Sequence, residues 1–104
     1  MPTVEAKKIV LQYAEKLRAA QFPFDALYLF GSYAKGEQRE NSDIDVAVIS
    51  PILRDTIRDE EFTLWRLRRA VDSRIDPHGF TPEDFANDVD PMVYEIKQTG
   101  VQMA

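Results

Sequence analysis

The sequence contains no cysteine and only one histidine, His78, among its 104 residues. The absence of thiols excludes disulfides, thiolate metal sites and cysteine nucleophiles. Any bound metal must therefore be held by oxygen ligands or by His78. No apolar run approaches the roughly 20 residues that span a bilayer, and nothing near Met1 has the pattern of a secretory signal. We expect a cytoplasmic protein without a membrane partner.

Positive charge is also scarce, because 13 basic side chains face 18 acidic ones and the formal net charge is −5. Nucleic-acid backbones are attracted by clustered lysine and arginine, so a long nucleic acid is not an expected partner. A small anion can still bind an acidic protein where metal ions or backbone N–H groups neutralise it. A nucleotide therefore remains a compatible ligand.

Length and composition indicate one globular domain over residues 1–104, with 44% hydrophobic and 30% charged residues. Apolar periodicity and turn residues predict an α-β-α-β-α-β-α order, hence an α/β domain in which helices flank a small mixed sheet of about three strands. Pro77 places the third strand at an edge or ends it, and Phe62 and Trp65 are interpreted as core residues. The predicted helices cover 4–20, about 54–72, a start at 81–84, and 91–99, and the predicted strands cover 26–30, 43–49 and 74–80.

A phosphate-binding turn is predicted where Gly31 and Ser32 follow the first strand. Glycine lets the backbone approach a ligand closely. Ser32 offers a hydroxyl and an N–H to a phosphate oxygen, especially if residues 32–36 begin a helix.

Two carboxylates open the second predicted strand. Because successive strand side chains point to opposite faces, Asp43 and Asp45 share a face while Ile44 lies on the other. Neighbouring like charges repel unless a positive charge lies between them. Mg²⁺ is commonly held by one or two carboxylates together with substrate phosphates, so this pair predicts a metal site.

Asp76 is the candidate for a third carboxylate, on the third strand. It is positioned to hold a second metal and to help deprotonate the attacking hydroxyl. His78 shares its strand face, but the adjacent Gly79 suggests a turn, and we interpret His78 as structural.

The segment Gly31-Ser-Tyr-Ala-Lys-Gly36, followed by Ser42-Asp43-Ile-Asp45, resembles the signature of the DNA polymerase beta-like nucleotidyltransferase superfamily. The chain as far as Phe80 is similar to its minimal nucleotidyltransferase branch. This resemblance implies two Mg²⁺ ions, with Mn²⁺ as an alternative. It also implies a site in which Gly31, Ser32 and Lys35 bind the nucleotide and Asp43, Asp45 and Asp76 are catalytic metal ligands.

The same resemblance implies transfer of AMP from ATP to a hydroxyl, with release of pyrophosphate. The acceptor would be a tyrosine of a HEPN-type toxin, and the protein would be the antitoxin of that pair. A partner or a second copy of the chain is expected to complete the site. Two alternatives remain: an antitoxin that neutralises its partner only by covering it, and a nucleotidyltransferase acting on a small molecule.

Overall fold

The computed structural model describes residues 3–39, 42–53 and 58–104, and these form a four-stranded sheet in the order β3-β2-β1-β4. β1 pairs antiparallel with β2 and β4, and β2 pairs parallel with β3, so the predicted mixed α/β fold is confirmed. The elements are α1 (Thr3–Ala19), β1 (Ala26–Phe30), α2 (Ser32–Lys35), β2 (Ile44–Ile49), the 3-10 turn η1 (Pro51–Leu53), α3 (Arg58–Arg68), β3 (Ile75–Phe80), α4 (Pro82–Phe85), α5 (Pro91–Thr99) and β4 (Val101–Gln102).

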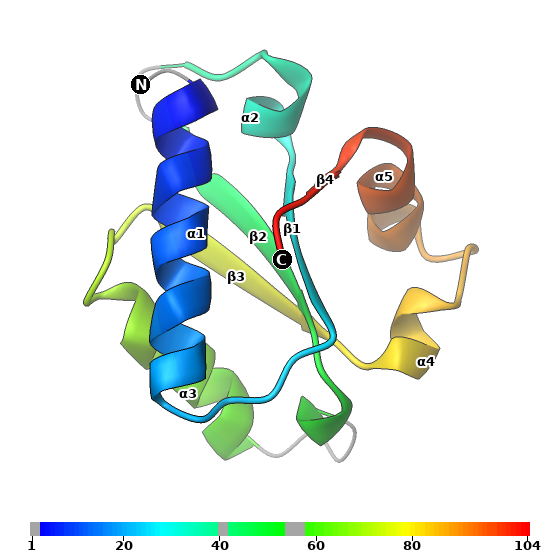
Figure 1. The fold of residues 1–104 in the computed structure, drawn as a ribbon. Coiled ribbons are helices and arrows are strands. Elements are labelled where there is room, and N and C mark those ends of the chain that lie inside the picture. The colour runs from blue at the N-terminus through cyan, green and yellow to red at the C-terminus, as the bar shows by residue number, and fades with distance from the viewer. Residues whose placement is uncertain (1–2, 40–41, 54–57) are drawn as a thin grey trace.

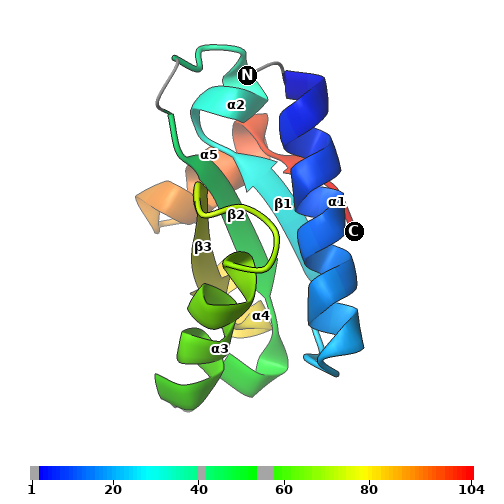
Figure 2. The same ribbon diagram turned by 90° about the vertical axis from the view of Figure 1, so that its left-hand side faces the viewer.

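Helices cover both faces of the sheet (Figures 1 and 2). α1 lies across one face, and α4 and α5 lie on the opposite side. Leu27 and Leu29 of β1 join the core that contains α1 and α3, whereas Ala26 and Phe30 pack in a second cluster with α5. Successive strand residues alternate between the faces, so the continuous apolar run of β1 reflects burial on both sides.

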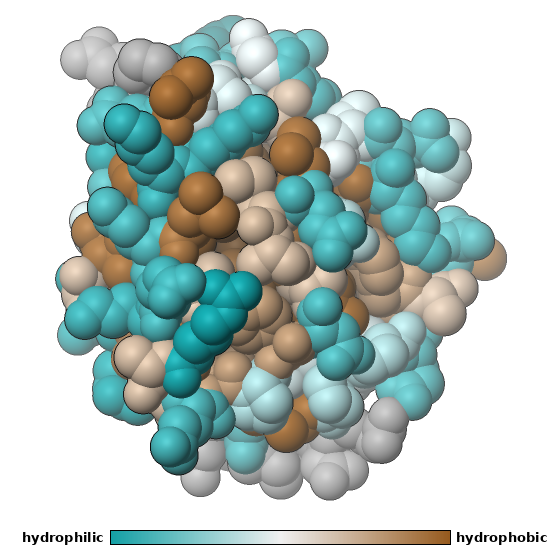
Figure 3. Space-filling model, in the orientation of Figure 1, coloured by the Kyte–Doolittle hydropathy of each residue, from teal (hydrophilic) through white to brown (hydrophobic). Residues whose placement is uncertain are grey.

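α1 packs through one apolar stripe, and the Tyr13 hydroxyl at its centre donates a 2.7 Å hydrogen bond to the Leu64 carbonyl of α3. Burial raises the pKa of the Tyr13 hydroxyl well above its usual range, against a smaller opposing effect of Arg68. The exposed side of α1 carries hydrophobic groups among hydrophilic ones (Figure 3). The buried stripe follows helical spacing and comprises Ala6, Ile9, Val10, Tyr13, Ala14 and Leu17.

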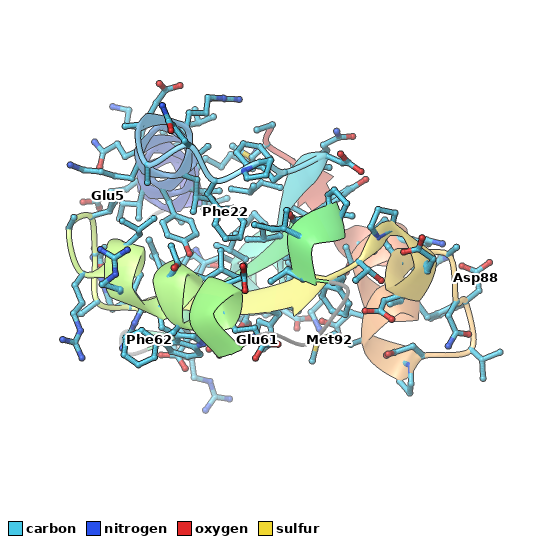
Figure 4. All side chains as sticks on the ribbon, turned by 90° about the horizontal axis from the view of Figure 1, so that it is seen from below. Glu5, Phe22, Glu61, Phe62, Asp88 and Met92 are labelled. Atoms are coloured by element: carbon cyan, nitrogen blue, oxygen red, sulfur yellow. The ribbon has the colours of Figure 1, made fainter. Side chains whose placement is uncertain are left out.

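α3 differs from its prediction in length and in orientation. Positions 54–57 of the predicted helix lie outside the described residues, and the helix ends at Arg68 rather than Asp72. Phe62 and Trp65 were expected in the core, but they are 69% and 43% exposed. The inward residue is Leu64, so Phe62, two positions away in a helix of 3.6 residues per turn, points outward from α3 (Figure 4).

The predicted helix termini after β3 are confirmed. Thr81 Oγ1 accepts from the Asp84 amide at 3.0 Å, while Asp84 Oδ2 accepts from the Thr81 amide at 3.1 Å, which completes a capping box. Asp90 caps α5 by accepting from the Met92 amide at 2.9 Å. Gly100 follows the last residue of α5, as its position in the sequence indicates.

The sheet has one more strand than predicted within the described residues. β4 adds to the free edge of β1 through Val101 and Gln102, and the Met103 amide donates to the Leu27 carbonyl at 2.7 Å. A two-residue strand carries too little alternation to be recognised in the sequence. The opposite edge is β3, where Pro77 lies as expected.

No helix in the described part of the chain is long and apolar enough to cross a membrane.

Candidate active site

The parallel pairing of β2 and β3 brings two of the predicted carboxylates together. Asp45 and Asp76 occupy the same register position, so their side chains leave the sheet side by side on the same face. Asp45 is also the cross-strand partner of Phe30 at the end of β1. Two acidic side chains in adjacent strands repel each other unless positive charge lies near them.

Gly31 closes the site on the β1 side. Its backbone has φ 75° and ψ −150°, a conformation that is essentially restricted to glycine. A Cβ added at this position would overlap Asp45 Oδ2. The absence of a side chain at Gly31 therefore lets the backbone lie directly against the Asp45 carboxylate.

Residues 32–36 do begin a helix, as the phosphate-binding turn favours, and α2 starts at Ser32. The Lys35 amide donates to the Gly31 carbonyl at 3.2 Å, and Gly36 ends the turn in the left-handed region with φ 71°. Ser32 is half-buried. The Lys35 Nζ lies 4.0 Å from Glu37 Oε1, in a pair that is open to solvent.

His78 faces both carboxylates, because it lies two residues after Asp76 on the same face of β3. Its Nε2 is 3.5 Å from Asp45 Oδ1 and 3.3 Å from Asp76 Oδ2. The edge of its ring meets Phe30, with 5.2 Å between the ring centroids. The Asp45 carboxylate raises the pKa of His78 most strongly, the charge of Asp76 adds to this, and burial opposes it.

The geometry of these three side chains fits a divalent cation. Among the described residues, Asp45, Asp76 and His78 each offer one ligand atom, and these atoms lie within 4.8 Å of one another. The Nε2 atom of His78 is buried and faces the two carboxylates without hydrogen-bond geometry to either. Carboxylate oxygens and neutral imidazole nitrogens are common metal ligands.

The structure separates Asp43 from this cluster. Asp43 is exposed and precedes β2 by one residue, whereas Asp45 is half-buried within the strand. The three grouped ligand atoms come from other residues.

His78 is the functional candidate that sequence reasoning set aside. Gly79 suggested a turn, but both residues lie within β3, where His78 pairs with Ala47. The i, i+2 spacing of Asp76 and His78 was the signal available in the sequence, and it becomes informative once the strand is known to be continuous.

The chain is similar to several known proteins. Over 50 residues the chain is 46% identical to the protein adenylyltransferase MntA of Shewanella oneidensis, an alignment that covers 48% of this chain and 35% of the relative. A crystal structure of a toxin–antitoxin complex with AMP-PNP contains a chain that is 28% identical, with a TM-score of 0.64 over 94% of this chain and 72% of that one.

A crystal structure from Sulfolobus solfataricus supports the fold alone, with 16% identity and a TM-score of 0.67 over 96% of this chain and 80% of that one. The alignment with the Shewanella relative spans only about a third of that protein's length. The model of the nucleotidyltransferase domain family matches residues 9–98, from α1 through α5. This match covers most of the chain, which therefore belongs to the nucleotidyltransferase domain family.

Proposed function

We propose that this protein is a protein adenylyltransferase that acts as the antitoxin of a toxin–antitoxin pair, transferring AMP from ATP to a tyrosine hydroxyl of a HEPN-type toxin. The observation that carries the proposal is the pairing of Asp45 and Asp76 across β2 and β3, directly against Gly31. Similarity to the Shewanella adenylyltransferase and to the toxin–antitoxin structure supports the choice of donor and acceptor.

In this proposal the turn after β1 holds the triphosphate. Gly31 permits close approach of the backbone, and Ser32 supplies a hydroxyl and an amide at the start of α2. Lys35, at the end of α2, contributes positive charge. Phosphoryl transfer is promoted mainly by positioning and charge neutralisation, so a turn of this kind has little covalent chemistry to perform.

Asp45 and Asp76 would hold the divalent ion, and Asp43, one residue before β2, would add a third carboxylate ligand. Mg²⁺ is the expected ion, two ions are expected with ATP, and Mn²⁺ is the alternative; bound metal supplies charge stabilisation to the attacking and leaving oxygens. The acceptor oxygen bonds to the α-phosphorus as the bond to the bridging oxygen breaks. Asp76 accepts the proton of the acceptor hydroxyl, and pyrophosphate leaves.

The test is incubation of the purified chain with α-labelled ATP, Mg²⁺ and the purified toxin encoded beside it. Asp45→Asn removes one charge from the site, and we expect it to abolish labelling of the toxin. Asp25→Asn is the matched control, because Asp25 lies at the opposite end of the β1–β2 pair, where its amide donates to the Ile49 carbonyl at 2.7 Å. This control is expected to label the toxin at the wild-type rate.

The same experiment separates the alternatives. If Asp45→Asn still neutralises the toxin, the chain acts as a binding module that covers its partner. If pyrophosphate is released while no protein is labelled, the acceptor is a small molecule. Absence of both label and pyrophosphate release from the wild-type chain would refute the enzymatic proposal.

A further inference from the structure

We propose that His78 is a nitrogen ligand of the metal site, and that it makes the site bind Mn²⁺ more tightly than Mg²⁺. The inference rests on the metal site of the proposed function and adds the identity of a ligand and of the preferred ion. Sequence reasoning selected three carboxylates for this site, whereas the structure brings together two carboxylates and one imidazole.

The position of the imidazole supports coordination. Its Nε2 lies 3.5 Å and 3.3 Å from oxygens of Asp45 and Asp76, which places it at the third corner of a compact cluster. The atom is buried and meets neither carboxylate with hydrogen-bond geometry. The two carboxylates repel each other unless positive charge lies between them, and a cation between the three ligand atoms would supply that charge.

The surroundings of His78 hold the ring toward the carboxylates. Pairing with Ala47 holds its backbone in β3, and the edge contact with Phe30 restricts the ring from the side of β1. Its side chain is 27% exposed, similar to the 26% of Asp45 and the 31% of Asp76. All three side chains are therefore partly exposed, to a similar extent.

The donor set determines which ion is preferred. Mg²⁺ strongly favours oxygen ligands in near-ideal octahedral geometry and gives up its waters reluctantly. First-row transition ions accept imidazole nitrogen more readily, and their affinities generally increase from Mn²⁺ toward Cu²⁺. Addition of the His78 imidazole to the carboxylates therefore strengthens binding of Mn²⁺ more than binding of Mg²⁺.

If His78 has a different role, its removal should change metal affinity in the opposite direction. If the imidazole only supplies positive charge that offsets the two carboxylates, it competes with the metal, and its removal should tighten the binding of every divalent ion. If it is a ligand, removal should weaken Mn²⁺ binding and leave Mg²⁺ binding nearly unchanged. The variant His78→Gln distinguishes these roles, since it retains a polar side chain of similar reach without the imidazole.

The experiment is calorimetric titration of the full chain and of His78→Gln with Mn²⁺ and with Mg²⁺, with and without a nonhydrolysable ATP analogue. We expect the wild-type chain to bind Mn²⁺ more tightly than Mg²⁺, and the variant to lose most of that difference. Asp25→Asn serves as the control and should keep the wild-type ratio.

Pulsed electron paramagnetic resonance of Mn²⁺ bound to the wild-type chain provides a readout that needs no variant. Coupling to a directly bound ¹⁴N nucleus is expected. Absence of this coupling, absence of metal binding, or tighter binding of both ions by His78→Gln would overturn the proposal. If ¹⁴N coupling is seen but the toxin is not labelled, the proposed transfer is refuted and His78 stands as a ligand. If the toxin is labelled without ¹⁴N coupling, the transfer stands and the ligand proposal is refuted.

Discussion

Replacement of Gly31 by alanine tests the link between the turn after β1 and the acidic site. Gly31 has φ 75° and ψ −150°, and an added Cβ would overlap the Asp45 carboxylate. The backbone conformation alone costs on the order of 1–3 kcal/mol in a residue other than glycine. Relief of the overlap requires Asp45 to move, and a displacement of about 1 Å at a reacting centre can cost about 100-fold in rate.

Gly36→Ala is the matched control, because Gly36 lies five residues after Gly31 and lacks its packing constraint. Gly36 also has a positive φ, 71°, but no atom of the described chain lies within 4 Å of an added Cβ. We expect this variant to lose about 1–2 kcal/mol of stability from the left-handed backbone. Its Asp45 carboxylate should remain in place, and Mn²⁺ binding should equal that of the wild-type chain.

Urea denaturation measures the free energy of unfolding of both variants, and Mn²⁺ titration with toxin labelling measures the state of the site. Gly31→Ala should show weaker metal binding and roughly 100-fold slower labelling. The reasoning is refuted if the two variants retain the same metal affinity and the same rate, because the close approach of Gly31 to Asp45 would then have no functional consequence.

Three further predictions concern the scaffold. Tyr13→Phe should lower the free energy of unfolding by about 1–2 kcal/mol in urea denaturation, because the Leu64 carbonyl loses its buried donor. Asp90→Ala should cost about 1 kcal/mol in the same assay by removing the cap of α5. Hydrogen bonds from Arg74 lower the pKa of Asp72, so this pair stabilises the fold above about pH 4, and the stabilisation is lost as the pH falls through the lower folded-state pKa. Asp72→Asn should therefore lower the free energy of unfolding by at most about 1 kcal/mol near neutral pH, because the Arg74 side chain is 42% exposed. It should also weaken the loss of stability at acid pH, and an unchanged pH dependence would contradict this.

The sequence was sufficient for local features whose cause is local. Gly31 ends a short apolar strand, and Pro91 and Gly100 mark the two ends of α5. These depend on backbone preferences and on periods of 2 or 3.6 residues, which neighbouring residues encode. The α/β class and the order of the elements followed from the same patterns.

The arrangement of residues distant in the sequence was decided by tertiary structure. Whether Asp76 meets Asp45 or another β2 residue depends on the register of a parallel pair, and a one-residue slip would turn its side chain to the other face. The exposure of Trp65 depends on which side of α3 packs against α1. His78 lies beside the two carboxylates because β3 pairs in parallel with β2 and all three side chains share one face of the sheet. Local sequence patterns do not encode this pairing.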